Sequence, residues 1–146
     1  METNSKTLIE IQTTVNDPIE KVWQVWGAPE HILNWNHASD DWHCPKATND
    51  LREGGRFVYT MAAKDGSVSF DFEGIYSEVK KYEVIEYTML DGRVARVEFT
   101  KADGSTRIVE MFEPETENTE DLQRDGWQSI LNNFKNYCEQ TELHLY

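Results

Sequence analysis

Residues 84–112 read VIEYTMLDGRVARVEFTKADGSTRIVEMF, and this stretch decides the fold. Asp91-Gly92 and Asp103-Gly104 each lie between segments in which apolar and polar residues alternate. Asp-Gly pairs favour the positive φ angles of tight hairpin turns, and a period of two is typical of β-strands. The stretch therefore predicts consecutive antiparallel strands at about 82–90, 93–100 and 105–113.

The same pattern extends toward the N-terminus. A further pair, Asp65-Gly66, is flanked by alternating aromatic and polar residues, and Lys80-Lys81 marks a looser turn. A first strand is predicted near the N-terminus, and a less clear strand precedes Gly54-Gly55. The additional predicted strands span about 7–15, 40–49, 56–64 and 67–79.

Two short helices are expected after the first strand. The sequence DPIE at 17–20 supplies a capping Asp17, a proline for the first helical position and the glutamate of a capping box, and Gly27 ends this helix. Pro29 begins a second helix that runs through Trp35.

A long helix is predicted over about 119–140. Twenty helical residues span about 30 Å, close to the length of a ten-residue strand, so the helix reaches across the sheet. Gly126 inside it costs about 1 kcal/mol relative to Ala and hints at a close approach or a bend, although a loose first turn of the helix explains it as well. The expected fold is α+β, a curved antiparallel sheet wrapped around this helix in a single domain, 1–146. The helix carries one apolar stripe: Trp127, Ile130, Leu131, Phe134, Tyr137 and Cys138.

Composition excludes several functional classes. The chain has 146 residues, 27 acidic and 14 basic side chains and a net charge of −13, which argues against nucleic-acid and anionic-membrane partners. Aromatic residues make up 12% of the chain, so we expect a folded protein. Neither a secretory h-region nor a membrane-spanning apolar run is visible, and Cys44 and Cys138 match no paired motif. We therefore expect a cytoplasmic protein with free thiols.

Short motifs follow one another along nearly the whole chain. Together they resemble the family similar to activator of heat-shock protein 90 ATPase, within the START-like (SRPBCC) superfamily. The resemblance implies the helix-grip fold and a cavity between sheet and helix. It does not fix the function, because lipid carriers, hormone receptors and polyketide cyclases share the superfamily. The motifs are Asp17-Pro18 with Val22-Trp23, Pro29-Glu30 with Trp35, Asp50-Leu51-Arg52-x-Gly54-Gly55-x-Phe57, Gly74-x-Tyr76-x-Glu78, Gly104-x-Thr106-Arg107, and Gly126-Trp127 before Leu131.

The chaperone activator that gives the family its name resembles this chain in only one of its two domains. Because the first predicted strand begins close to Met1, we expect no chaperone-binding partner domain and no stimulation of a chaperone ATPase.

Large side chains gather on one predicted sheet face and on the facing helix stripe. They either fill a solid core or line an apolar pocket, and the resemblance favours the pocket. The candidate ligand-binding residues are Trp35, Phe57, Tyr59, Phe70, Phe72, Tyr87, Met89, Phe99, Ile108, Glu110, Trp127, Leu131 and Phe134.

Glu110 is the sharpest polar candidate. If Ile108 points inward, Glu110 does too, and a buried carboxyl needs a partner or takes up a proton. In the other register Val109 and Met111 point inward and Glu110 is exposed, and the sequence leaves both registers open. Arg96 and its neighbours are expected to form a solvated ladder of charge pairs on the opposite face.

No metal or cofactor site is expected. His37, His43 and Cys44 have no standard zinc-ligand spacing. Gly54-Gly55 precedes a strand rather than a helix, which indicates a turn or bulge instead of a phosphate cradle.

The favoured function is binding of an apolar or aromatic small molecule between sheet and helix. The first alternative is a polyketide cyclase- or hydrolase-like enzyme in which Glu110 acts with Tyr59 or Tyr87 as donors, although no catalytic residue is assigned. The second is an interaction module that contacts chaperones through its acidic surface. An exposed edge strand also makes a homodimer an expectation.

Overall fold

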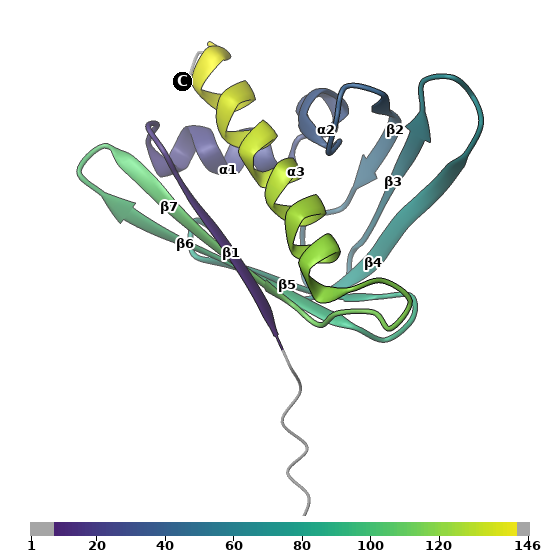
Figure 1. Cartoon of the computed structure of the whole chain (residues 1–146). Coiled ribbons are helices and arrows are strands. Elements are labelled where there is room, and N and C mark those ends of the chain that lie inside the picture. The colour runs from purple at the N-terminus through teal and green to yellow at the C-terminus, as the bar shows by residue number, and fades with distance from the viewer. Residues whose placement is uncertain (1–7, 143–146) are drawn as a thin grey trace, which may run out of the picture.

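Seven antiparallel strands form one curved sheet in the computed structural model, which describes residues 8–142 (Figure 1). The strand order is β1-β7-β6-β5-β4-β3-β2, so the first strand pairs with the last and lies at one edge. The helix-grip architecture predicted from the sequence is confirmed, although Thr7, the first residue of the predicted first strand, lies outside the described residues. The strands are β1 Ile9–Val15, β2 Trp42–Asn49, β3 Arg56–Ala63, β4 Ser69–Lys80, β5 Val84–Met89, β6 Val94–Ala102 and β7 Ser105–Phe112.

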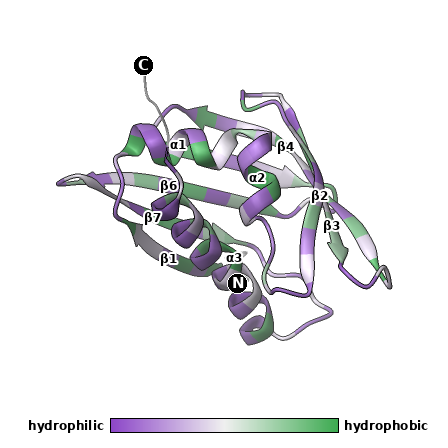
Figure 2. Cartoon of the chain, turned by 90° about the horizontal axis from the view of Figure 1, so that it is seen from above, coloured by the Kyte–Doolittle hydropathy of each residue, from purple (hydrophilic) through white to green (hydrophobic). Residues whose placement is uncertain are grey.

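Helices α1 (Ile19–Gly27), α2 (Pro29–Trp35) and α3 (Glu120–Gln140) all lie on the concave side of the sheet, and α3 crosses it diagonally (Figure 1). Figure 2 shows hydrophobic and hydrophilic residues alternating along the strands, as a sheet with one covered face requires. No helix among residues 8–142 is long and apolar enough to cross a membrane.

The Asp-Gly pairs form the predicted hairpin turns. Gly66, Gly92 and Gly104 have φ angles of 80°, 93° and 85°, a region that glycine enters without a steric penalty. The resulting register pairs Val97 with Glu110, which places Glu110 on the concave face and excludes the register in which it would be exposed.

The start of α1 differs from the prediction. Pro18 is extended, with ψ of 157°, so the helix begins at Ile19 and the predicted side-chain cap by Asp17 is absent. The Asp17 carboxylate instead pairs with Lys21 at 3.1 Å, and its carbonyl accepts a hydrogen bond from Thr106 Oγ1 at 2.9 Å. Asp17 therefore ties the entry of α1 to β7.

Helix α3 is capped by Thr119, whose hydroxyl accepts a hydrogen bond from the Leu122 N–H at 3.1 Å. Leu131 and Phe134 face inward and are fully buried. A Cβ at Gly126 would meet nothing within 4 Å, so the expected close approach is not found there.

The convex face carries the predicted charge ladder. Arg96 on β6 forms ion pairs with Glu78 at 3.0 Å, Glu86 at 3.2 Å and Glu98 at 2.9 Å. These pairs occupy the face opposite Glu110, so these four charged side chains lie away from the aromatic interior.

Candidate functional site

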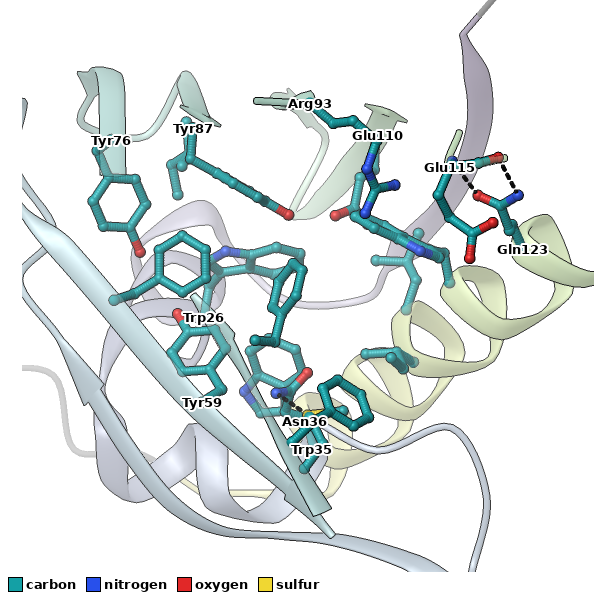
Figure 3. Close-up of a pocket in the computed structure, with 18 residues that line it drawn as sticks. Trp26, Trp35, Asn36, Tyr59, Tyr76, Tyr87, Arg93, Glu110, Glu115 and Gln123 are labelled. Atoms are coloured by element: carbon teal, nitrogen blue, oxygen red, sulfur yellow. Dashed lines mark hydrogen bonds between the residues drawn. The ribbon is translucent and has the colours of Figure 1, made fainter. Parts of the chain in front are cut away.

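A pocket of about 320 Å³ lies between α3 and the concave face of the sheet (Figure 3). Its walls come from α1 and α2 at one end, β3, β4 and β5 along one side, and α3 along the other. Several of the residues predicted to bind a ligand lie in these walls: Trp35, Phe57, Tyr59, Phe70, Phe72, Tyr87, Glu110, Trp127 and Leu131.

The other predicted residues are core residues and do not line the pocket. Met89 and Ile108 are buried in the sheet. Phe99 and Phe134 pack against Trp26, with ring centroids 5.6 Å and 4.9 Å away. Phe99 and Phe134 therefore lie behind Trp26, which itself lines the pocket.

The aromatic walls are fixed by ring contacts. Trp127 stacks on buried Phe112 at 3.8 Å with an interplanar angle of 9°, and its edge meets Phe72 at 6.0 Å. On the opposite side Phe57 contacts Tyr87 at 4.9 Å in a T-shaped arrangement. Because each ring is held by another, the pocket is preformed rather than opened by a ligand.

Glu110 points into this pocket with only 7% of its surface exposed (Figure 3). Its strand neighbours are Val97 on β6 and Ile11 on β1, and its carboxyl makes no hydrogen bond to any residue of 8–142. Burial raises the pKa of Glu110 to about 8. The carboxyl is therefore mostly protonated at neutral pH.

The Tyr87 hydroxyl points toward Glu110 from β5 (Figure 3). Burial, and next the charge of Glu110, hold the pKa of Tyr87 well above its usual range. The two side chains bring a carboxyl and a phenol together on one side of an otherwise apolar wall, and both can donate or accept a hydrogen bond.

Asn36 supplies a second polar group. Its side chain is 6% exposed, and its Nδ2 donates to Met61 Sδ at 3.1 Å. Its Oδ1 has no hydrogen-bond partner among the described residues. The Tyr76 hydroxyl, by contrast, is occupied, because it donates to Asn49 Oδ1 at 2.5 Å, and Asn49 Nδ2 donates to the Gly27 carbonyl at 2.8 Å.

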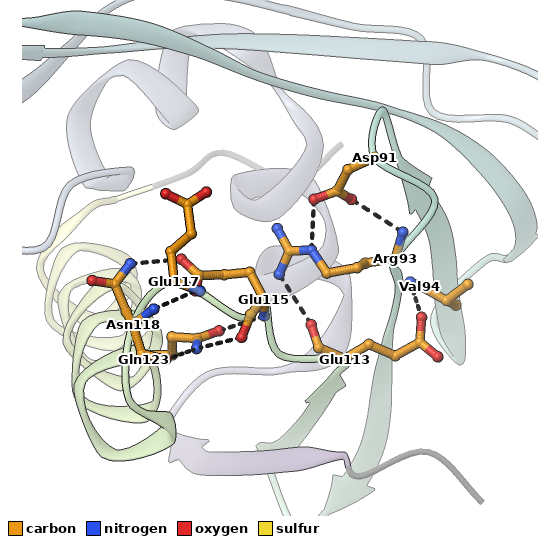
Figure 4. A network of polar contacts seen from close by, with 8 residues as sticks. All are labelled: Asp91, Arg93, Val94, Glu113, Glu115, Glu117, Asn118 and Gln123. Atoms are coloured by element: carbon orange, nitrogen blue, oxygen red, sulfur yellow. Dashed lines mark hydrogen bonds and ion pairs between the residues drawn. The ribbon is translucent and has the colours of Figure 1, made fainter. Parts of the chain in front are cut away.

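The segment 113–119, between β7 and α3, forms part of the pocket rim and is held in place by polar contacts (Figure 4). Gln123 accepts a hydrogen bond from the Glu115 N–H at 2.9 Å and donates to the Asn118 carbonyl at 2.9 Å. Arg93 donates to the Glu113 carbonyl at 3.0 Å. The rim is therefore held from α3 on one side and from the turn between β5 and β6 on the other.

Several lining residues were not among the predicted ligand-binding residues. Gln123 had a usable signal, because it precedes Trp127 by four residues and extends the inner stripe of α3. Tyr76 had one too, since it alternates with Phe72 along β4. Arg93 and Glu115 lie at a turn and in a loop, where no period applies. The full set is Trp26, Asn36, Met61, Tyr76, Ile85, Arg93, Glu115, Gln123 and Ile130.

Among residues 8–142, no group of three or more His, Cys, Asp or Glu side chains is arranged to hold a metal ion. Cys44 and Cys138 are both free and buried. Glu110, Tyr87 and Asn36 are among the polar residues that line the pocket.

Solved structures similar to this chain have the same fold. An AHSA1-like protein of Aeromonas hydrophila is 41% identical with a TM-score of 0.85, and the match covers 95% of this chain and 100% of that one. A protein of Cytophaga hutchinsonii is 51% identical with a TM-score of 0.78, over 94% and 98% of the two chains. A Nitrosomonas europaea protein at 18% identity and a TM-score of 0.79, over 94% and 97%, shows the fold alone.

A comparison with curated proteins gave no match. The family model for Activator of Hsp90 ATPase homolog 1-like protein matches residues 16–139. That match spans most of the chain, and the protein belongs to this family.

Proposed function

We propose that this protein binds an apolar, aromatic small molecule in the pocket between α3 and the sheet. The observation that carries the proposal is a preformed space of about 320 Å³, half of whose lining residues are aromatic. Ligand sites are typically concave, mostly apolar and fitted with a few polar groups, and Glu110, Tyr87 and Asn36 supply those groups here.

The volume also sets the size of the ligand. At a packing density of about 0.75, the pocket of 320 Å³ holds about 240 Å³ of ligand atoms, which is the size of about four fused rings. One end of the ring system would contact Trp127 and Phe72, and its other end would contact Trp35.

Isothermal titration calorimetry with naphthalenemethanol, a neutral two-ring probe, tests the proposal. Wild-type protein is expected to bind it, and Ile130→Trp, which fills the pocket from α3, is expected to abolish binding. Leu122→Trp is the matched control, because Leu122 lies on the same helix with 59% of its surface exposed. Absence of binding to the wild type, or equal binding to Ile130→Trp, contradicts the proposal.

A second measurement identifies the natural ligand. Native mass spectrometry of protein purified from its own host is expected to show a co-purified molecule that is missing from Ile130→Trp.

A further inference from the structure

We infer that the natural ligand carries a protonated amine, which pairs with the Glu110 carboxylate while its rings lie against the aromatic walls. This inference rests on the proposed binding function. It names the chemical class of the ligand, a lipophilic aromatic amine, and the side chain that recognises it.

The first step is the isolation of the Glu110 carboxyl. Buried carboxyls in proteins normally have a hydrogen-bond or ionic partner. Glu110 is 7% exposed and lines the pocket, yet its carboxyl has no hydrogen-bond partner within residues 8–142. A partner supplied by the ligand would satisfy it.

The second step is the set of polar groups that share the pocket with Glu110. Arg93 is the cation in the pocket wall, and its guanidinium donates to Asp91 at 2.8 Å and to the Glu113 carbonyl at 3.0 Å. Tyr87 offers a neutral hydroxyl. The pKa of Glu110 is raised by burial alone, with no opposing contribution from Arg93. Residues 8–142 thus supply no cation that pairs with Glu110.

The α3 side of the pocket does not supply a cation either. Gln123 is engaged with the 113–119 rim. The Glu115 carboxylate accepts hydrogen bonds from the Glu117 and Asn118 N–H groups, both at 2.7 Å. Among the pocket-lining acids, Glu110 is therefore the carboxyl available to a ligand.

The third step is the character of the walls. Aromatic faces attract cations, and the pocket that Glu110 lines is also lined by Trp26, Trp35 and Trp127, while the Tyr87 side chain points toward Glu110 (Figure 3). A net charge of −13 adds a field that attracts cations and repels anions. An anionic ligand such as a fatty acid would instead place its carboxylate against Glu110.

Three naphthalene probes of one size separate the possibilities: naphthylmethylamine, naphthalenemethanol and naphthoate. At about pH 8 roughly half of the Glu110 carboxyls are ionised. At this pH, calorimetry is expected to show that the amine binds about tenfold tighter than the alcohol, because charge-assisted hydrogen bonds are stronger than hydrogen bonds between neutral groups. Naphthoate is expected to bind more weakly than either.

The isosteric variant Glu110→Gln is expected to abolish the preference for the amine over the alcohol, so that the two probes bind it with similar affinity. Glu10→Gln is the control for total charge, since Glu10 is exposed on β1, and it should keep the amine preference. Equal binding of amine and alcohol to the wild type overturns the inference, and so does a preference that survives in Glu110→Gln.

Proton release provides a readout that needs no variant. At about pH 7 the amine is expected to displace nearly one proton per site from Glu110, so its binding enthalpy depends on the ionisation enthalpy of the buffer. The alcohol should release none, and an amine enthalpy independent of buffer contradicts the pairing. If the alcohol binds and the amine gains nothing, only this inference fails; if none of the probes binds, the proposed function fails with it.

Discussion

Replacing Glu110 by Gln should change how the stability of the protein depends on pH. The pKa of Glu110 is raised from 4.5 to about 8 by burial, so folding takes up a proton between these values. A raised pKa contributes stability that is fully present below the unfolded value and lost as pH rises through the folded value. The free energy of unfolding of the wild type should therefore fall by about 1.4 kcal/mol per pH unit in this window.

Over the whole window from 4.5 to about 8 the loss amounts to about 5 kcal/mol. Glu110→Gln keeps the shape and removes the titration. Its free energy of unfolding, relative to wild type, should rise steadily across the window. Urea unfolding followed by tryptophan fluorescence from about pH 5 to about pH 8 measures this difference.

The charged and titratable groups that share the pocket with Glu110 do not produce the same slope. The pKa of Tyr87 lies well above the window. Glu115 titrates below the window because the pKa of its carboxyl is lowered by hydrogen bonds from Asn118. Glu10→Gln, on the exposed face of β1, should run parallel to wild type. Parallel curves for Glu110→Gln and wild type would refute the assignment of a buried, unpartnered carboxyl.

Other substitutions test the positions that hold the pocket. Gly126→Ala should stabilise the protein by about 0.5–1 kcal/mol in urea unfolding, because its Cβ enters open space on α3, and destabilisation would contradict this. Gly74→Ala should destabilise it by about 1–3 kcal/mol in the same assay, since its Cβ would lie 2.9 Å from the Phe57 ring, and an unchanged midpoint would count against the packing. Gln123→Ala should speed hydrogen exchange of the Glu115 amide by about tenfold or more, because that N–H loses its acceptor, and unchanged exchange would show that the rim is held by other contacts.

The strands and their turns were predictable because their signals are local. Asp91-Gly92 and Asp103-Gly104 fix tight turns by backbone conformation, and the alternation on either side of them fixes which residues share a face. In β7 the alternation of apolar and polar residues was ambiguous, so it did not show which face of the strand points inward. Both faces of β7 carry apolar residues, so only pairing with β6 and β1 placed Glu110 inside.

At one end of the pocket, two of the residues predicted to line it, Phe99 and Phe134, lie behind its wall. Phe99 and Phe134 have the same pattern as the lining residues, but Trp26 from α1 covers them. The position of α1 depends on long-range contacts such as the Thr106 hydroxyl to the Asp17 carbonyl, which no local pattern reveals. Arg93 also lines the pocket through a long-range contact, because its guanidinium extends from the turn before β6 to the Glu113 carbonyl.

Two polar residues interrupt apolar patterns that face the pocket, and they differ in whether their side chains have hydrogen-bond partners. Gln123 interrupts the inner stripe of α3, and Glu110 interrupts the inner face of β7. Gln123 meets the backbone of the 113–119 rim, so its amide is fully used and its role is structural. The strand partners of Glu110 are the apolar residues Ile11 and Val97, and Tyr87, whose hydroxyl points toward it, makes no hydrogen bond to it. A break in a hydrophobic pattern thus marks a position where a polar partner is needed. Residues 8–142 supply that partner at Gln123 and not at Glu110, and this difference is the reason we propose Glu110 as a ligand-binding residue.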